Sequence, residues 1–450
     1  MSAFRPDLFA GRRYAVVGLG KSGLPAAQGL RAMGAQIAVW DDSEEARKSA
    51  SGFPLIRDDF AFDALVLSPG IPHLLPKPHP LAERARAAGM PILAETELLF
   101  QAVRRAGSRA RFAGITGTNG KSTTTAMLAH VLNSAGYRAV AGANLGPAAL
   151  SLPLLPDDGI YVLEMSSYML ERIATLRFDA AAMLNLSADH LDRHGDMEGY
   201  ARAKRAIFDR QLPGNLAVVG IDDADSRALA DSLPRKPVTV SGEAPAGIWC
   251  DGGVLRDSDG PILHMADAAA LPGSHNAQNA AAVSAMAMFF GVSRDAIARG
   301  ITSFPGLPHR QQRVATVDGI VFINDSKATN ADSAARALSC HERVIWIAGG
   351  MAKEGGIEPL TRYFPGIART FLIGRDAPIL AATLARHGAR HETVGTLEAA
   401  VTAAFQAAKQ EGAPVVLLSP ACASWDQFTG YDQRGDRFAE LARGLTARAA

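Results

Sequence analysis

A glycine-rich segment around residue 117 constrains the fold of this chain more than any other stretch. An apolar, strand-like run leads into a loop that holds Gly117 and Gly120, and Lys121 and Ser122 follow directly. The apolar periodicity of residues 126–135 then predicts a helix, which completes the order strand, phosphate loop, helix. Backbone amides and a helix N-terminus bind phosphate oxygens in such a loop. We therefore expect an ATP site in which Lys121 reaches the terminal phosphates and Ser122 ligates Mg²⁺.

Length and composition set the broad class. The 450 residues suggest two to four domains, and 46 basic against 45 acidic side chains give no indication of nucleic-acid or membrane-surface binding. Three cysteines far apart in the sequence argue against a disulfide framework or a thiolate metal site. No signal peptide or membrane span is recognisable. We expect a soluble, cytoplasmic protein without nucleic-acid partners or membrane insertion.

The N-terminal part carries a second glycine motif. Residues 14–23 combine a buried strand with a Gly-X-Gly-X-X-Gly turn, and the next strand ends at Asp41. A third strand, 64–67, ends at Ser68-Pro-Gly-Ile. This order is similar to a Rossmann fingerprint, in which an acidic residue contacts a ribose hydroxyl. The alternative is that these glycines only permit tight packing of strand and helix.

Polar clusters follow two later apolar strands. Glu164 ends one strand, and in a sheet with a phosphate loop an acid at that position can hold Mg²⁺ or orient water. Asp189 and His190 follow the next strand, and their oxygen and imidazole ligands suit a second divalent ion. Lys204 lies in an amphipathic helix with several cations, and this pattern alone predicts a solvated lysine.

The rest of the chain alternates strands and helices. Asp-Gly and Ser-Asp-Gly turns within residues 248–265 predict antiparallel hairpins. Strands and helices alternate again after residue 307, which predicts a βαβ sheet. We predict an α/β protein of three domains: an N-terminal Rossmann-like nucleotide-binding domain (1–99), a central P-loop ATPase-like α/β domain (100–306) and a C-terminal Rossmann-like α/β domain (307–450).

Further residues suit a phosphoryl-transfer site. Arg310 lies at a domain junction and could neutralise charge that develops on a phosphoryl group. Asn276 and Asn279 share one helix face, where their amides could read an adenine edge. Cys422 has no histidine near it in sequence, so we interpret it as a small packing residue.

Taken together, these segments resemble the Mur ligases of peptidoglycan synthesis over essentially the whole chain. The specific segments are Gly117–Thr123, Glu164–Ser167, Asp189–Asp192, Gly273–Asn276, Gly306–Arg310, Asn324–Asn330 and Ser419–Phe428. The resemblance implies a reaction in which ATP phosphorylates a carboxylate and an amine attacks the resulting acyl phosphate. The chain lacks the Asp-Asn-Pro-Arg segment of the ligases that add a diamino acid, which supports D-glutamate as the amine. The resemblance implies UDP-N-acetylmuramoyl-L-alanine as its acceptor.

The resemblance also implies roles for individual residues. Lys121, Glu164, His190 and Lys204 would be the catalytic residues. Two Mg²⁺ ions would be held by Ser122 and Glu164, and by His190 and a carbamylated Lys204. The ATP-binding positions would be Thr118, Asn119, Gly120, Lys121, Ser122, Thr123, Thr124, Asn276, Asn279, Arg310 and Asp325. The substrate-binding positions would be Lys21, Ser22, Asp41, Ser68 and Gly70 for the UDP moiety, Asn144 for the muramoyl-alanine part, and Lys327, Thr329, Lys353, Ser424 and Tyr431 for D-glutamate.

The chain departs from the family pattern at three positions. Met169 stands where a glutamine is expected, which removes a polar contact to the nucleotide substrate. Met351 stands where an aspartate is common before Lys353, and Tyr431 takes a position often held by phenylalanine. None of these positions belongs to the predicted ATP and metal set, and we expect a monomer that acts on small molecules.

Other classes of function remain open on the sequence. A nicotinamide dehydrogenase would use the first glycine motif but would leave the phosphate loop without a role. A regulatory P-loop ATPase or binding protein would hydrolyse ATP regardless of which amino acid is present. A sister ligase, including a folylpolyglutamate-type enzyme, is the nearest alternative.

Overall fold

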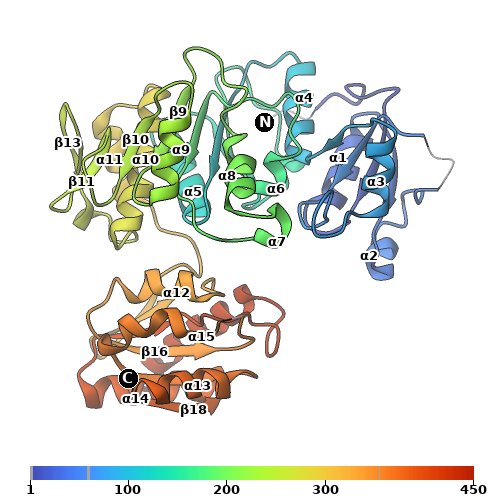
Figure 1. Ribbon diagram of the computed structural model, residues 1–450. Helices are drawn as coiled ribbons and strands as arrows, with labels where there is room; N and C mark the ends of the chain where they lie inside the picture. Colours follow the sequence, from blue (N-terminus) through green and yellow to red (C-terminus); the bar gives the residue numbers. More distant parts are fainter. Residues whose placement is uncertain (1–3, 58–60, 354, 450) are drawn as a thin grey trace. The chain divides into compact units, whose positions relative to one another are not determined.

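The computed structural model describes residues 4–57, 61–353 and 355–449. The chain forms two compact units (Figure 1). The first unit comprises residues 1–268 and 276–304, and the second comprises residues 269–275 and 305–450. The first unit holds two sheets and the second holds one. The predicted α/β class with several sheets is confirmed, whereas the predicted domain boundaries after residues 99 and 306 remain predictions.

The first sheet is parallel, in the order β2-β1-β3-β4. Its strands and helices are β1 (Arg13–Val17), α1 (Gly23–Ala32), β2 (Gln36–Trp40), α2 (Glu44–Ser49), β3 (Ala64–Leu67), α3 (Pro80–Ala87), β4 (Ile92–Leu93) and α4 (Glu95–Arg105). Glycine is required at the start of α1, because a Cβ atom on Gly23 would lie 1.6 Å from the carbonyl oxygen of Gly18. The glycine turn therefore packs α1 tightly against the end of β1.

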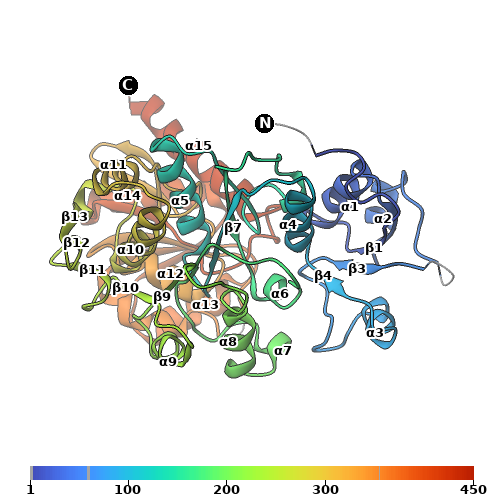
Figure 2. The same cartoon turned by 90° about the horizontal axis from the view of Figure 1, so that it is seen from above.

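The second sheet has nine strands in the order β13-β12-β11-β10-β9-β8-β5-β7-β6. The strands are β5 (Arg111–Thr116), β6 (Ala139–Ala143), β7 (Ile160–Glu164), β8 (Ala180–Met183), β9 (Leu216–Gly220), β10 (Val238–Ser241), β11 (Ile248–Asp251), β12 (Val254–Asp257) and β13 (Gly260–His264). The helices are α5 (Lys121–Ser134), α6 (Ser167–Leu170), α7 (Leu191–His194), α8 (Met197–Arg205), α9 (Ala224–Ser232), α10 (Ser274–Phe289) and α11 (Arg294–Thr302), with the short 3₁₀ turns η1 (Ala149–Ser151) and η2 (Met265–Asp267). Helices α5 and α11 pack side by side (Figure 2).

The third sheet, in the second unit, has the order β14-β15-β19-β16-β17-β18, and only β14 runs antiparallel to its neighbour. Its strands are β14 (Gln312–Val317), β15 (Ile320–Asn324), β16 (Val344–Gly349), β17 (Ile367–Ile373), β18 (His391–Gly395) and β19 (Val415–Leu418). The helices are α12 (Ala331–Leu338), α13 (Ala377–Arg386), α14 (Leu397–Glu411) and α15 (Tyr431–Ala449), with the 3₁₀ segment η3 (Glu358–Gly366).

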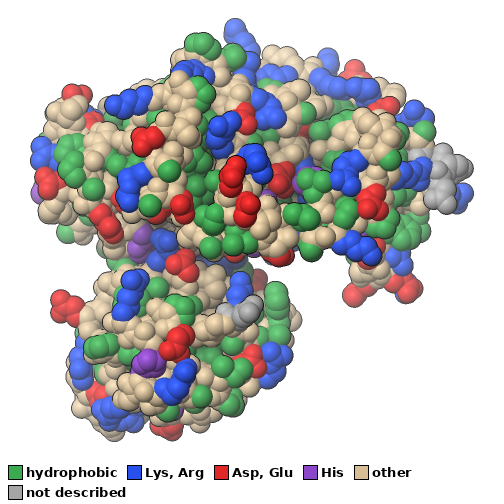
Figure 3. All heavy atoms as spheres, in the orientation of Figure 1, with side chains coloured by type: hydrophobic (Ala, Val, Ile, Leu, Met, Phe, Trp, Pro, Cys, Tyr) green, Lys and Arg blue, Asp and Glu red, His purple; other side chains and the backbone are tan. Residues whose placement is uncertain are grey.

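The sequence patterns match these elements closely. The hairpins predicted for residues 248–265 are confirmed by the antiparallel pairs β11–β12 and β12–β13. Within the described part of the chain, no helix is both long and apolar enough to cross a bilayer. On the face drawn in Figure 3, acidic and basic side chains are interspersed, in line with the balanced composition.

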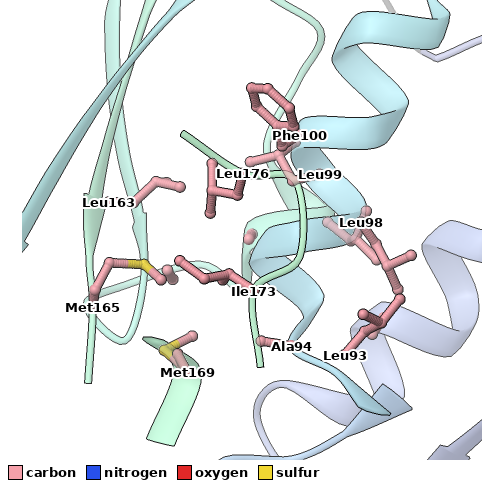
Figure 4. Close-up of a cluster of buried hydrophobic side chains, with 14 of the residues drawn as sticks. Leu93, Ala94, Leu98, Leu99, Phe100, Leu163, Met165, Met169, Ile173 and Leu176 are labelled. Carbon is pink, nitrogen blue, oxygen red and sulfur yellow. The ribbon is translucent and has the colours of Figure 1, made fainter. Parts of the chain in front are cut away.

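A continuous apolar core joins the first two sheets. Figure 4 shows Leu93 and Ala94, at the end of the first sheet, near Met169 and Ile173 of the segment that follows β7. Glu97 of α4 fixes this contact, because its carboxylate accepts hydrogen bonds from the backbone amides of residues 174–176 at 2.8–3.0 Å. Burial by itself would raise the pKa of Glu97, but hydrogen bonds from Thr175, Gln101 and these amides outweigh it and lower the pKa.

Replacing this carboxylate should therefore destabilise the first unit. We expect Glu97→Gln to cost about 1–3 kcal/mol, because buried amides lose an ionised acceptor. Since the folded pKa of Glu97 is lowered, its contribution is present above its unfolded pKa of 4.5 and is lost as pH falls through the folded value. Thermal unfolding at pH 7 and at pH 4 measures both effects. The exposed Glu83→Gln is the matched control, and equal melting temperatures for the two variants at pH 7 would contradict the assigned role.

Candidate active site

Three polar loops meet at one edge of the central sheet. Strand β5 lies between β7 and β8, and all three strands are parallel. The glycine loop after β5, Glu164 at the end of β7 and the 185–190 loop after β8 therefore lie side by side. The carboxyl ends of neighbouring parallel strands are where open α/β sheets bind ligands.

The glycine loop is held in a defined conformation by its neighbours. Gly120 has φ 84°, a left-handed value that favours glycine, and it precedes the first turn of α5. Asn185 accepts a hydrogen bond from the amide of Asn119 at 2.8 Å and donates one to its carbonyl at 3.1 Å. Lys121 folds back on the loop, where its Nζ donates to the carbonyls of Gly117 at 2.9 Å and Thr118 at 2.8 Å. The loop is thus shaped around the Lys121 cation.

Lys204 is buried beside this loop. Its side chain is 2% exposed, and its Nζ donates to the same Gly117 carbonyl at 2.8 Å. The pattern-based prediction of a solvated lysine is therefore wrong, because Tyr200, Ala203 and Lys204 form the buried face of α8 while Arg202 and Arg205 form its exposed face. Burial and the Lys121 ammonium hold the pKa of Lys204 well below its usual value.

Glu164 supplies a buried carboxylate to the same edge. Its Oε1 accepts a hydrogen bond from the Asn144 side chain at 2.7 Å, and its Oε2 is buried without a hydrogen-bond partner among the described residues. The structure therefore places Asn144, a predicted substrate contact, against a predicted metal ligand. An unpartnered carboxylate oxygen is the group that a hard cation would satisfy.

The donor set fits Mg²⁺ better than a metal held by protein alone. Among the described residues, no group of three or more His, Cys, Asp or Glu side chains is arranged to hold a metal ion. The predicted set contains two such side chains, Glu164 and His190, together with Ser122 and Lys204. Mg²⁺ typically takes only one or two carboxylates and completes its coordination with water and substrate phosphates.

His190 lies at the partly exposed side of the cluster. It has φ 54° and precedes α7, and its ring centroid is 5.2 Å from that of Tyr168. Burial and the nearby Lys204 and Lys121 cations lower its pKa, although Asp189 opposes this. His194 of the same segment is instead tied to α6, where its Nε2 lies 2.9 Å from the Ser167 hydroxyl. A lowered pKa favours the neutral imidazole that metals require.

Of the two asparagines of α10 predicted to bind ATP, Asn279 lies beside the glycine loop. Asn279 donates to the side-chain oxygen of Asn276 at 3.1 Å, and both residues are buried. A Cβ atom on Gly120 would lie 2.5 Å from Asn279 Oδ1. The amides predicted to read adenine thus border the loop predicted to bind phosphates.

The remaining predicted ATP residues lie in the second unit. Asp325 follows β15, and its carboxylate accepts hydrogen bonds from the Ser419 hydroxyl at 2.7 Å and the Gln311 amide at 3.1 Å. Burial raises the pKa of Asp325 to about 7, although these hydrogen bonds and the nearby Arg310 act in the opposite direction. The predicted ATP set is therefore divided between the two units.

The residues predicted to bind D-glutamate gather on loops of the third sheet. β15, β19 and β16 are neighbours, and the loops that follow them carry Thr329, Ser424 and Lys353. Lys327 lies over the Tyr431 ring, with Nζ 3.7 Å from the centroid. Buried Arg434 ties all three loops together, since it donates to the carbonyls of Ser326 (2.9 Å), Cys422 (3.1 Å) and Gly349 (3.4 Å).

The predicted nucleotide loops lie at one edge of the first sheet. The Ser68 hydroxyl donates to Gly18 O at 2.7 Å, and Asp41 accepts from the amides of Leu19 at 2.7 Å and Ser43 at 2.9 Å. Asp41 therefore orders the glycine turn, in addition to its predicted contact with a ribose. Lys21 is exposed, Ser22 is half-buried and Gly70 is exposed, so these three predicted positions are open to a ligand.

Several residues that hold the site together were not predicted from the sequence. Asn185 pins the glycine loop, the Tyr200 hydroxyl lies 3.3 Å from Thr118 Oγ1, and Arg172 is buried between the first two sheets. Only Tyr200 left a signal, because it precedes Lys204 by four residues on one helix face. Burial raises the pKa of Cys422 to about 12, which agrees with its interpretation as a packing residue.

Comparison with known proteins identifies the class. The first unit combines a largely parallel sheet with a glycine loop and two lysines that donate to Gly117 O, and the second unit is a separate α/β unit. The family model of the Mur ligase middle domain matches residues 115–287, and that of the Mur ligase glutamate ligase domain matches residues 309–422. Together the two models match more than half of the chain, and the chain therefore belongs to the Mur ligase family.

Within this family, the chain is similar over nearly its whole length to relatives that share one name. The UDP-N-acetylmuramoylalanine–D-glutamate ligase of Paramagnetospirillum magneticum is 50% identical, with 97% of this chain and 98% of the relative covered. The relative of the same name from Caulobacter vibrioides is 44% identical, with 98% of this chain and 97% of the relative covered. The identity extends over nearly the full length of each protein.

Solved structures share the fold. The MurC ligase of Thermotoga maritima has a TM-score of 0.61 at 18% identity and covers 96% of this chain and 99% of its own. The MurF ligase of Thermotoga maritima, solved in complex with ADP, has a TM-score of 0.60 at 16% identity and covers 99% of this chain and 100% of its own. The multidomain fold is therefore that of the Mur ligases.

The buried carboxyl of Asp325 should make the second unit sensitive to pH. Because its folded pKa is about 7 and its unfolded pKa about 4, the unfolded chain releases this proton first as pH rises, so stability falls between these values. We expect Asp325→Asn to reduce the loss of melting temperature between pH 5 and pH 8. The exposed Glu392→Gln is the control, and an unchanged pH dependence in the Asn variant would contradict the burial of this charge.

Proposed function

We propose that this chain is an ATP-dependent amide ligase that joins D-glutamate to UDP-N-acetylmuramoyl-L-alanine in the synthesis of peptidoglycan precursors. The observation that carries the proposal is the 50% identity, over 97% of the chain, to a relative named for that activity. The lysine pair at Gly117 and the cations of the third sheet supply the chemistry that such a reaction needs. A dehydrogenase or a regulatory ATPase would leave the full-length match unexplained.

Each domain has a separate task in this proposal. The Rossmann-like first domain, residues 1–99, binds the UDP moiety through Lys21, Ser22, Asp41, Ser68 and Gly70. The P-loop ATPase-like central domain, residues 100–306, binds ATP. The Rossmann-like third domain, residues 307–450, presents D-glutamate. The enzyme acts as a monomer in the cytoplasm, where ATP is at hand.

The first chemical step is phosphoryl transfer. A carboxylate oxygen of the L-alanyl group attacks the γ-phosphorus of ATP, and the bond to the bridging oxygen breaks to release ADP. Lys121 is close to the loop carbonyls in the structure and can turn to the phosphates that replace them. Its positive charge then offsets negative charge that develops on the transferring group. Asn276 and Asn279 hold the adenine, and Arg310 and Asp325 complete the nucleotide site.

The second step forms the amide. The uncharged amine of D-glutamate attacks the acyl carbon, and the tetrahedral intermediate collapses by breaking the carbon–oxygen bond to phosphate, while the amine loses a proton. Lys327 and Lys353 pair with the two carboxylates of D-glutamate, an arrangement that charge-assisted hydrogen bonds favour. Thr329, Ser424 and Tyr431 complete this subsite. Arg434 holds the loops that carry these residues in register.

Two Mg²⁺ ions fit the residues at the central site. Ser122 and Glu164 would hold one ion, and His190 and a carbamylated Lys204 the other. When bound, the ions would neutralise phosphate charge in both the ground state and the transition state. Asn144 orients Glu164 through the 2.7 Å hydrogen bond, and its predicted contact with the muramoyl-alanine part remains part of this proposal.

Carbamylation of Lys204 is supported by its environment. The uncharged amine attacks CO₂ to form a carbon–nitrogen bond, and one proton is released as the carbamate anion forms. Burial and Lys121 favour the uncharged amine. The carbamate then places an anion beside Lys121, which replaces a repulsion between two cations with an attraction.

Substrate dependence tests the ligase proposal. Phosphate release from ATP should require both UDP-N-acetylmuramoyl-L-alanine and D-glutamate, because the acyl phosphate forms only on the acceptor and is consumed only by the amine. A coupled phosphate assay across a panel of amino acids and acceptors measures this requirement. Full turnover with either substrate omitted would exclude the ligase, and preference for another amino acid would point to a sister enzyme.

Lys204 provides a second test. We expect Lys204→Ala to lower kcat by about 100-fold or more, the scale found when a group that stabilises transition-state charge is removed. Acetate or propionate should restore part of the activity by occupying the vacated carbamate space. The exposed Lys236→Ala is the control and should keep full activity. Undiminished ligation by the Lys204 variant would rule out its role at the metal site.

A further inference from the structure

A buried arginine of the central domain reaches into the first sheet. Arg172 follows α6, and its side chain is 2% exposed. Its Nη1 donates to the carbonyls of Leu67 and Ser68, both at 3.0 Å, and its Nη2 donates to the carbonyl of Ile71 at 2.7 Å. Its Nε donates to His73 Nδ1 at 3.3 Å. One guanidinium therefore holds most of the loop that follows β3.

A second arginine from the same domain holds the rest of this loop. Arg193 of α7 donates to the carbonyl of Gly70 at 2.9 Å, and its guanidinium lies 4.4 Å from the centroid of the Tyr168 ring. Arg172 and Arg193 thus bind the carbonyls of residues 67, 68, 70 and 71. The loop conformation depends on the central domain, although the loop belongs to the first sheet.

The acceptors of Arg172 are neutral. Burial and Arg172 itself lower the pKa of His73 to about 4, so its imidazole is uncharged at neutral pH. Burial lowers the pKa of Arg172 to about 10, which leaves the guanidinium charged. None of its hydrogen bonds within the described residues goes to a carboxylate. The Glu171 carboxylate acts on this guanidinium through space and not through a hydrogen bond, so it offsets the positive charge only in part.

The charge lies beside the predicted nucleotide site. Arg172 lines a narrow cavity of about 10 Å³ together with Ser22 and Ser68, two residues of the predicted UDP set. Met169 lines the same cavity and is packed into the apolar core in Figure 4. Glu95 also lines this cavity, and burial raises its pKa to about 7.

We propose that Arg172 is a positioning residue for the sugar-nucleotide substrate. It locks loop 68–71 against the central domain and places a positive charge behind the site of a nucleotide diphosphate. This inference rests on the proposed function for the identity of the substrate.

Substitution of Arg172 tests the positioning role, because the KM for one substrate should change while kcat and the other KM values do not. Arg172→Met should raise the KM for UDP-N-acetylmuramoyl-L-alanine by about 10–100-fold, the scale of losing charge-assisted hydrogen bonds. The kcat and the KM values for ATP and D-glutamate should change less than threefold. Arg172→Lys keeps the positive charge but loses the several N–H donors of the guanidinium. Its KM for UDP-N-acetylmuramoyl-L-alanine should therefore lie between the values of the wild type and Arg172→Met. The exposed Arg177→Met is the matched control and should leave every parameter unchanged.

A titration with UDP alone tests the role of Arg172 independently of whether the protein is a ligase. Calorimetric titration of the full-length protein with UDP needs no turnover, and Arg172→Met should weaken UDP binding at least tenfold. If the wild-type protein does not ligate, the proposed function fails while this titration still tests Arg172. Arg193→Met, which removes the hydrogen bond to Gly70 and the guanidinium contact with the Tyr168 ring, gives a second variant with an expected threefold to tenfold effect if Arg172→Met does not fold. Equal changes in all kinetic parameters, or unchanged UDP affinity, would overturn the positioning role.

Discussion

Two lysines that share one carbonyl oxygen define the chemistry of this molecule. Lys121 and Lys204 both donate to Gly117 O, at 2.9 and 2.8 Å, and Lys204 is almost fully buried. Like charges in a desolvated site destabilise one another. The repulsion between the two ammonium groups is relieved when one amine loses its charge or when an anion binds beside them. In the proposed function, nucleotide phosphates and a carbamate on Lys204 would each bring negative charge to this pair and relieve the repulsion.

Strand order brings the partners of this pair together. β5 lies between β7 and β8, so the glycine loop, Glu164 and the 185–190 loop share one edge without any long connection. The first sheet is joined to this edge by the buried guanidinium of Arg172 and the ionised carboxylate of Glu97. These two groups bind backbone atoms, which fixes loop conformation more strongly than apolar contact does. The loop that follows β3 and the glycine loop that follows β5 therefore both belong to the first unit.

Residues whose role depends on local sequence were predictable. The glycines at 117 and 120 and the acid at 164 stand at strand ends that the apolar pattern marks, and the hairpins within residues 248–265 follow from their turns. Lys204 was misread from pattern alone, because its charge suggested solvent although it shares the buried face with Tyr200. Arg172 left no signal, since its acceptors are backbone carbonyls about a hundred residues earlier. A hydrogen bond from a side chain to a distant backbone carbonyl leaves no pattern of residue types in the sequence, so it could not be predicted.

The path of one oxygen atom from the acceptor carboxylate to phosphate reveals whether an acyl phosphate forms. If the L-alanyl carboxylate attacks ATP, one of its oxygens must leave with inorganic phosphate when the amide forms. UDP-N-acetylmuramoyl-L-alanine labelled with ¹⁸O in that carboxylate should give one ¹⁸O atom per phosphate released in the presence of D-glutamate, as measured by mass spectrometry. Product formation with unlabelled phosphate would contradict an acyl-phosphate intermediate and the account built on it.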